Sequence, residues 1–498
     1  MDLGPNGNSQ TNPLMFQFYT WDAMHPTMSW WAYFESEVPH LAQLGVTQVW
    51  LPPPNKATHK LGQGYDAYDL WDLGEFDQKG TKATRWGTKE ELQQAVSTAK
   101  AHGIDVIIDA VLNHKIGADR TEVFKAVPVN EKNRHQEAGP PREIEGWTAY
   151  DFKGRGGKYS SMRWTHEHFT GLDWDHRSKK NAIYRIAHKP WSPNVDQENG
   201  NYDYLLGIDI DLQHPEVKED LKRWGTWVLD TIGASGFRLD AIKHMDHKFL
   251  LEWIHSVRKQ PNRSRTFAVG EYWSGDGKSL LNYVKNFKGQ LSFFDVPLHY
   301  RFHETSKAGA TYDLRTIMND TVLWHQPHDA VTFVDNHEYQ IGQTLESWVY
   351  NAFKLQAYAL ILLRGEGHPC VFYGDLYANK ECDTSAIAPI LRKLMGLRKA
   401  HAHGPVNDYF HDRNCIGFVR MGEKDRAGCV VVISNADKEG KAQNAAATHT
   451  IPMFVGKHNA KKVYTASLGS SERVQVSAKG WAHFACPPGG LQVWVPTL

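Results

Sequence analysis

The chain has 498 residues, and its 56 Lys and Arg balance its 56 Asp and Glu, so the formal net charge is zero. Proteins that bind nucleic acid or an anionic membrane surface usually carry a basic excess, which this composition lacks. No segment reaches the ~18 consecutive apolar residues of a membrane-spanning helix. We therefore expect neither a nucleic-acid partner nor a membrane partner, and the length suits a barrel with additional domains.

The amino-terminal segment and the cysteines both bear on the compartment. The opening residues MDLGPNGNSQTNP contain no basic n-region and no apolar h-region, so no signal peptide is visible. The five cysteines lie in the last third of the chain without a C-x-x-C pair, which indicates reduced thiols. We expect a cytoplasmic monomer. A mature secreted chain restarted at an added Met would look the same, so secretion stays open.

Apolar runs alternate with amphipathic stretches, as is typical of repeated β-α units. The segments Lys89–His102 and Pro215–Ile232 have helical spacing, and the second opens with a proline suited to a first helical turn. Eight parallel strands close a barrel, and eight are expected here. They are Leu14–Tyr19, Val46–Leu51, Ile104–Asp109, Gly236–Asp240, Thr266–Glu271, Leu291–Asp295, Ala330–Val334 and Cys370–Tyr373.

Two further regions interrupt or follow this pattern. Between residues 115 and 213 the composition shifts to Gly, Trp, Asn and Asp, as in FKGRGGKYS and QENGNYDY, and we expect a separate irregular domain there. After residue 402 the runs become short and alternating, which predicts a small antiparallel β domain. The predicted fold class is therefore α/β: a (β/α)8 TIM barrel over 1–114 and 214–401, an inserted domain over 115–213, and a C-terminal β-sandwich over 402–498.

Three of the predicted strands end in a carboxylate. They are GFRLD, ending at Asp240, FAVGE, ending at Glu271, and TFVD, ending at Asp335. The carboxyl ends of parallel barrel strands meet on one face, so we expect these three acids to converge there. Such a group of acids suits acid/base and nucleophilic chemistry.

The neighbours of two of these acids suggest different tasks. Arg238 lies two residues before Asp240 and faces the same side of the strand, so we expect it to lower the pKa of Asp240, as suits a nucleophile. Glu271 is followed by Tyr272 and Trp273, and apolar walls suit a general acid, which has to hold a proton. A charged nucleophile beside a protonated acid is the requirement for retaining glycoside hydrolysis.

Four short segments carry a family resemblance. DAVLNH, GFRLDAIKH, GEYW and FVDNH resemble the four signature regions of the α-amylase family of glycoside hydrolases. Longer strings, including GYDAYDLWDLGEFDQKGT and ENGNYDY, resemble its bacterial liquefying and intracellular fungal types. The resemblance implies a (β/α)8 barrel, a domain B after the third strand, a C-terminal Greek-key domain, and endo-hydrolysis of α-1,4-glucans with retention.

The resemblance also implies roles for individual residues. Asp240 matches the nucleophile, Glu271 the acid/base and Asp335 the transition-state stabiliser. The implied substrate contacts are Arg238 beside the nucleophile, His114 and His337 at the cleavage site, Lys243 and His244 on the leaving-group side, and Tyr65 stacked on the attacked sugar. For Tyr65 core packing stays open, and for Lys243 a solvated position stays open.

Asn113, Asp203 and Asp209 offer the hard oxygen ligands that calcium prefers. On composition alone the two aspartates could equally be turn residues. The resemblance adds the backbone carbonyl of His244 as a ligand. We expect one structural Ca²⁺ that joins domain B to the barrel.

Two departures from the family pattern are visible. Heat-stable bacterial members carry a second metal cluster, and the corresponding positions here are Thr170, Ser192 and Gln213, which lack the charge for one. The family usually has Asp after FVDNH, whereas this chain has Glu338. We expect Glu338 to leave the chemistry intact and to alter packing beside Asp335.

The favoured function is α-amylase hydrolysis of starch, glycogen or maltooligosaccharides. The alternative within enzymes is transglycosylation of the 4-α-glucanotransferase type at the same site, since the same intermediate can be captured by a sugar. A binding protein that has lost catalysis is disfavoured because all three acids are present. A metal-dependent amidohydrolase would need two histidines one residue apart at the first strand end, and FQFYTW has none.

Overall fold

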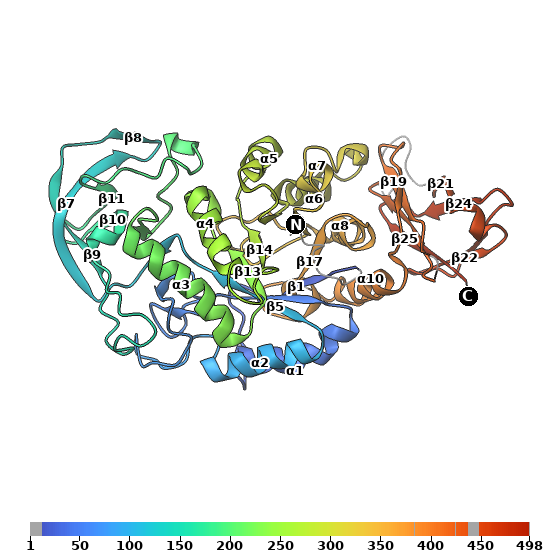
Figure 1. Ribbon diagram of the computed structural model, residues 1–498. Helices are drawn as coiled ribbons and strands as arrows, with labels where there is room; N and C mark the ends of the chain where they lie inside the picture. The colour runs from blue at the N-terminus through green and yellow to red at the C-terminus, as the bar shows by residue number, and fades with distance from the viewer. Residues whose placement is uncertain (1–11, 383, 424, 437–447, 498) are drawn as a thin grey trace.

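The computed structural model describes residues 12–382, 384–423, 425–436 and 448–497. At its centre is a closed barrel in which the strands follow the order β1-β17-β16-β15-β14-β13-β5-β2, each paired in parallel with its neighbours (Figure 1). The barrel strands are β1 (Met15–Gln17), β2 (Gln48–Leu51), β5 (Asp105–Ala110), β13 (Gly236–Leu239), β14 (Phe267–Gly270), β15 (Ser292–Phe294), β16 (Ala330–Phe333) and β17 (His368–Phe372).

Helices surround the barrel, and their ends follow from local sequence. α2 begins at a capping box in which Thr88 accepts from the Glu91 amide and Glu91 accepts from the Thr88 amide. α3 begins with Pro215 and ends before Gly233, whose φ of 80° only glycine adopts without strain. The helices are α1 (Trp30–Gln43), α2 (Lys89–Ala101), α3 (Pro215–Ile232), α4 (His247–Arg258), α5 (Gly277–Val284), α6 (Val296–Ala308), α7 (Val322–His325), α8 (Asn351–Leu363), α9 (Tyr373–Leu376) and α10 (Ala388–His401).

The eight barrel strands are those expected from the sequence, with ends that differ by one or two residues. Nearly every barrel-strand residue is buried, because helices cover the outside and side chains fill the inside. This double burial explains why the strands are rich in apolar residues and lack a regular polar alternation. The α/β TIM-barrel class is thereby confirmed.

The insertion between β5 and β13 contains a seven-stranded sheet. Its first strand pairs with its last, with Asp209 opposite His114, so the insertion leaves and rejoins the barrel at one place. The prediction of an irregular domain was wrong here, because strands with polar outer faces resemble loops in composition. The strands are β6 (His114–Lys115), β7 (Arg120–Asn130), β8 (Asn133–Glu137), β9 (Arg142–Ala149), β10 (Phe169–Asp175), β11 (Lys180–Ile186) and β12 (Ile208–Ile210). A separate small sheet pairs β3 (Lys56–Ala57) with β4 (Ala67–Asp69).

The C-terminal region forms antiparallel sheets at the opposite end of the molecule from the insertion (Figure 1). The predicted antiparallel β domain is therefore confirmed, while the exact domain boundaries remain predictions. Three strands with polar alternate residues, β18, β21 and β24, were not anticipated. The strands are β18 (Val406–Tyr409), β19 (Cys415–Arg420), β20 (Cys429–Ser434), β21 (His449–Phe454), β22 (Val463–Ala466), β23 (Arg473–Gln475), β24 (Trp481–Cys486) and β25 (Leu491–Pro496).

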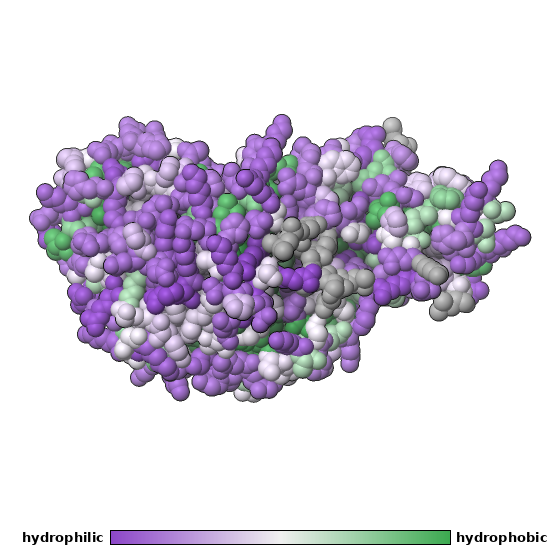
Figure 2. Space-filling model, viewed as in Figure 1, coloured by the Kyte–Doolittle hydropathy of each residue, from purple (hydrophilic) through white to green (hydrophobic). Residues whose placement is uncertain are grey.

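The surface agrees with the balanced composition. Figure 2 shows a face that is mostly hydrophilic, with small hydrophobic areas scattered over it. Among the described residues, none of the helices has the length and apolar character needed to cross a bilayer. All five cysteines are buried and unpaired.

Candidate active site

The guanidinium of Arg238, on β13, is the centre of the site. It lies 2.6 Å from the Asp240 carboxylate, 2.5 Å from that of Glu271 and 2.8 Å from that of Asp109. Neither Arg238 nor Asp109 is exposed to solvent. One buried cation thus gathers three carboxylates from the adjacent strand ends of β5, β13 and β14, which no single pair of strands would bring together.

Asp109 is an orienting group rather than a reacting one. Its Oδ2 accepts hydrogen bonds from the Tyr65 hydroxyl at 2.7 Å, from Trp50 Nε1 at 3.2 Å and from the Tyr19 hydroxyl at 3.2 Å. Because its oxygens are occupied in this way, Asp109 fixes Arg238 and Tyr65 in place.

A cavity of about 1160 Å³ opens above these strand ends. Asp240, Glu271 and Glu338 line it, and one carboxylate oxygen from each lies within 4.8 Å of the other two. Retaining glycosidases hold two carboxyl groups about 5–5.5 Å apart, and inverting ones about 6.5–9.5 Å apart. The spacing of Asp240 and Glu271 therefore suits direct attack by one of them.

Arg238 lowers the pKa of Asp240 as expected, but the net shift of that pKa is upward. Burial is the largest influence and raises the pKa of Asp240 to about 7, because a charged carboxylate loses its hydration. Arg238 opposes this shift, but the neighbouring charges of Glu271 and Asp109 add to it. The arginine is shared among three acids and cannot compensate the burial of all of them.

Asp335 is not at this site. The strand β16 ends at Phe333, so Asp335 lies beyond it, where it forms a 2.9 Å ion pair with Lys354 of α8 and accepts a hydrogen bond from the Val349 amide. Lys354 also pairs with Asp375 at 2.7 Å. The described residues that line the cavity do not include Asp335. The prediction that Asp335 joins the other two acids is therefore corrected.

Glu338 occupies the place expected for Asp335. The side chain of Asn336 accepts hydrogen bonds from the amides of Glu338 and Tyr339, at 2.9 and 3.0 Å, and this turn directs Glu338 to the cavity. Burial and the charges of Glu271 and Asp240 raise the pKa of Glu338 well above its ordinary value. Asn336 is a residue type that favours turns, so the sequence could have indicated this one. The prediction missed it because it extended the strand segment to Asp335.

The predicted substrate contacts Tyr65, His114 and His337 lie near one another. Tyr65 and His114 line the cavity. The His337 ring stacks on Tyr65 with 5.3 Å between ring centroids. Trp21 stacks on both of these rings, with its centroid 5.7 Å from that of Tyr65 and 5.9 Å from that of His337. His337 Nδ1 is hydrogen-bonded to Gln17 at 2.9 Å, whereas its Nε2 makes no hydrogen bond among the described residues and lies 3.8 Å from the Glu338 carboxylate. Trp21 was not anticipated, because one aromatic residue beyond a strand carries no distinctive pattern.

Comparisons with known proteins agree with this geometry. Residues 34–392 match the model of the alpha amylase catalytic domain. The chain is 42% identical over 488 residues to "Alpha-amylase" of Geobacillus stearothermophilus, covering 97% of this chain and 87% of the relative. It is 38% identical to "Cytoplasmic alpha-amylase" of Escherichia coli, covering 97% of this chain and 99% of the relative. The chain belongs to the α-amylase family.

A solved structure has the same fold as this α-amylase-family chain. The α-amylase of Geobacillus thermoleovorans, complexed with acarbose, superimposes with a TM-score of 0.65 at 17% identity, covering 98% of this chain and 99% of that one. As a member of this family the chain is a glycoside hydrolase, and the cavity with Asp240, Glu271 and Glu338 is its candidate active site.

On one wall of the cavity, the insertion contacts the barrel through a charged pair. Lys243 and His244 both line the cavity, as does Glu198 of the insertion, which forms an ion pair with Lys243. Lys243 also donates to the Trp273 carbonyl at 3.3 Å. His244 Nδ1 is hydrogen-bonded to the Tyr202 carbonyl at 2.8 Å, and burial lowers the pKa of His244 to about 4. The neutral ring therefore holds the insertion against the barrel.

The candidate calcium ligands Asn113, Asp203 and Asp209 are buried. The amide of Ile210 donates to the Asn113 carbonyl at 3.0 Å, which places Asp209 near Asn113. Burial raises the pKa of Asp203 to about 8 and that of Asp209 well above its ordinary range, and the charge of Asp203 adds to the upward shift of Asp209. Neither has an ion-pair partner among the described residues. Two buried acids that no cationic side chain of the described residues neutralises fit a site for a hard divalent ion.

The three positions considered for a second metal cluster act as hydrogen-bond donors. Ser192 Oγ donates to Asp246 at 2.8 Å and Gln213 Nε2 donates to the same oxygen at 2.6 Å. Thr170 donates to Asp209. The Ser192 hydroxyl and the Gln213 amide connect the insertion to the start of α4, where Asp246 also caps the helix.

Proposed function

We propose that this enzyme hydrolyses internal α-1,4-glucosidic bonds of starch, glycogen or maltooligosaccharides with retention of configuration. The observation that carries the proposal is the placement of Asp240 and Glu271 on one buried arginine and on one cavity. Glu271 protonates the glycosidic oxygen while Asp240 attacks the anomeric carbon. Water activated by Glu271 then releases the glycosyl-enzyme.

Glu338 takes the third role in this scheme. It faces the same cavity as the reacting pair, and its carboxylate is close enough to both to contact the same sugar ring. We assign to Glu338 the hydrogen bonding of the distorted sugar in the transition state. Asp335 instead stabilises the turn after β16 through Lys354.

The other cavity residues position the glucan. His337, whose Nε2 lies 3.8 Å from Glu338 without a hydrogen bond among the described residues, is assigned to the sugar at the cleavage site. His114, which lines the cavity and is held by the Tyr65 carbonyl at 2.8 Å, is assigned to the same sugar. Tyr65 is placed to stack on the attacked sugar, because flat aromatic faces suit the C–H faces of a pyranose. Lys243 and His244 form the leaving-group side, and Arg238 holds the acids.

One calcium ion completes the structural part of the proposal. Asn113, Asp203 and Asp209, with the backbone carbonyl of His244, would hold it between the insertion and the barrel. The ion would neutralise two buried acids and fix one wall of the cavity, without taking part in bond cleavage.

The cellular setting proposed is that of a cytoplasmic monomer. A relative at 38% identity bears the name cytoplasmic alpha-amylase, and the five thiols here are buried and unpaired. The mostly hydrophilic face in Figure 2 agrees with a monomer.

Analysis of the first products tests the proposal. Proton NMR of maltooligosaccharide cleavage should show the α-anomer first, and chromatography should show shorter chains from internal cleavage. A first product in the β-configuration would contradict retention. Chains longer than the substrate as main products would instead support the transglycosylation alternative.

A further inference from the structure

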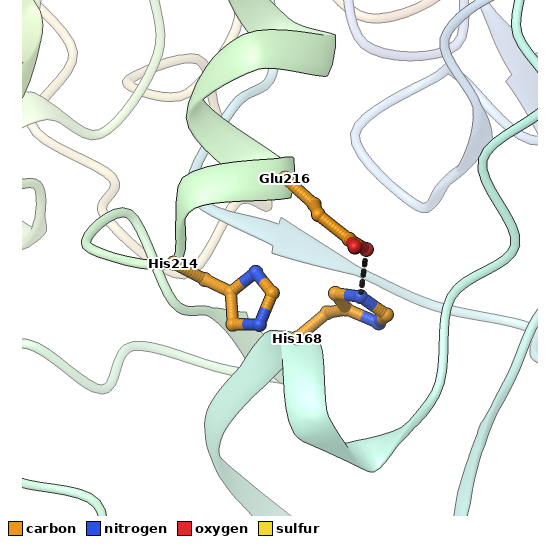
Figure 3. A group of neighbouring side chains, drawn as sticks. All are labelled: His168, His214 and Glu216. Atoms are coloured by element: carbon orange, nitrogen blue, oxygen red, sulfur yellow. Dashed lines mark hydrogen bonds and ion pairs between the residues drawn. The ribbon is translucent and has the colours of Figure 1, made fainter.

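A group of two histidines and a glutamate lies outside the active site, where the insertion meets α3 (Figure 3). His168 belongs to the short helix His166–His168 of the insertion, His214 precedes α3, and Glu216 lies in its first turn. One ligand atom from each of the three lies within 4.8 Å of the other two. The fold thus brings His168 of the insertion next to His214 and Glu216, which follow it by more than forty positions in the sequence.

The imidazole of His214 belongs to this group. One of its ring nitrogens, Nδ1, is buried and has no hydrogen-bond partner among the described residues. Burial also lowers the pKa of His214, so the ring is neutral and keeps a free lone pair at neutral pH. A buried nitrogen without a partner calls for an explanation, and a bound ion is one.

The other two side chains already face each other. His168 Nε2 lies 3.2 Å from the Glu216 carboxylate, and a dashed line in Figure 3 marks this contact. The Glu216 side chain is 72% exposed and can move toward the two rings. The charges that act on His214 from Lys189 and Asp211 offset each other, since these two are paired at 2.7 Å.

We propose that His168, His214 and Glu216 form a binding site for Zn²⁺ that joins the insertion to α3. Two imidazoles and one carboxylate are a ligand set that zinc accepts, with water in the fourth position. Zinc–ligand bonds of about 2.0–2.2 Å require the three atoms to draw together by roughly 1 Å, which the exposed Glu216 allows.

Binding requires a change of tautomer at His168. Its Nδ1 now accepts from the Thr165 amide at 3.0 Å, so the ring proton is on Nε2. Zinc on Nε2 moves that proton to Nδ1, where Thr165 Oγ1 at 3.3 Å can accept it. The Thr165 amide loses its acceptor, so the turn has to adjust. We therefore expect a site of moderate affinity that also fills with other ions preferring imidazole.

The site is independent of the catalytic proposal. Zinc here would connect the insertion to the barrel at a second place, apart from the candidate calcium ligands. Its expected consequence is stability: an ion that binds only the folded chain raises the temperature of unfolding.

Calorimetric titration of the full chain with ZnCl2, in calcium-containing buffer without chelator, tests the proposal. We expect one equivalent bound per chain and an upward shift of the unfolding temperature. His214→Ala and Glu216→Ala should lose that equivalent and the shift, while glucan hydrolysis stays unchanged. Glu216 is exposed, so its replacement leaves the fold intact even if a histidine variant fails to fold.

His325→Ala is the matched control. His325 lies 3.9 Å from the Asp320 carboxylate at the surface, so it forms a histidine–carboxylate contact like that of His168 with Glu216, but with no second histidine. It should bind zinc as the unmodified chain does. Unchanged binding in Glu216→Ala, or equal loss in His325→Ala, would overturn the proposal. Loss of hydrolysis in Asp240→Asn with zinc binding intact would separate the two sites.

Discussion

The ammonium of Lys354 lies 2.9 Å from the Asp335 carboxylate, and neither side chain is exposed to solvent. Lys354 also contacts Asp375, and the Tyr358 hydroxyl donates to Asp375 at 2.6 Å. This buried network joins the end of β16 to α8 and to the residues after β17. The role of Asp335 follows from the network: it supports the loop that carries His337 and Glu338.

Replacing Asp335 should therefore affect stability more than chemistry. In Asp335→Asn, Lys354 loses one of its two buried partners, and we expect a loss of about 3 kcal/mol in the free energy of unfolding. The kcat of the folded fraction should fall far less than that of a variant of the reacting acids. Denaturant unfolding and active-site titration measure the two effects separately.

Glu338→Gln should show the reverse pattern. The side chain keeps its size, but a carboxylate beside the reacting sugar is lost, and we expect kcat to fall by about 10²–10³-fold with little change in unfolding temperature. Glu304→Gln, at another residue lining the cavity, is a control that should retain activity. Equal activities of Glu338→Gln and the unmodified enzyme would return the third role to another group.

The dependence of the rate on pH should reflect the buried position of Asp240. Burial raises its pKa to about 7, so the carboxylate takes up a proton as the pH falls through that value and can no longer attack. The acid limb of kcat/KM should thus lie above the ordinary aspartate range, although it reports the whole group of acids. A limb near pH 4 would contradict a raised pKa of Asp240, because kcat/KM reports the groups of the free enzyme.

Removal of calcium should destabilise the chain. Chelation would leave Asp203 and Asp209 uncompensated, and an ion present at a hundred times its dissociation constant contributes about 2.7 kcal/mol. We expect a lower unfolding temperature in chelator, and the same low value for Asp203→Asn with or without calcium. Asp230→Asn, at an exposed carboxylate of α3, should respond to calcium like the unmodified chain.

The barrel could be predicted from the sequence because its strands are buried on both sides. Gly236–Leu239 and Ala330–Phe333 are mostly apolar and are buried at every position, as is typical of a parallel sheet covered on both faces. The sheet of the insertion could not be predicted in the same way. In β8 four of five residues are exposed, so burial left no pattern in the sequence.

The site was predictable where a strand end fixes a side chain, and not where a turn does. Asp240 and Glu271 directly follow β13 and β14, and both lie where the strand pattern placed them. Glu338 is five residues beyond β16, and its direction depends on hydrogen bonds to Asn336. The direction of the pKa shift of Asp240 could not be predicted either. It depends on how many acids share Arg238, and that number follows from contacts between three strands.

Trapping the covalent intermediate tests the central claim most directly. A fluorinated maltosyl fluoride, which forms the glycosyl-enzyme faster than water releases it, should lose its anomeric fluoride and add one fluorinated maltosyl group to the peptide that contains Asp240. Asp240→Asn should remain unlabelled, and Asp230→Asn should be labelled normally. An adduct on another residue, or none while the reagent is turned over, would contradict the account.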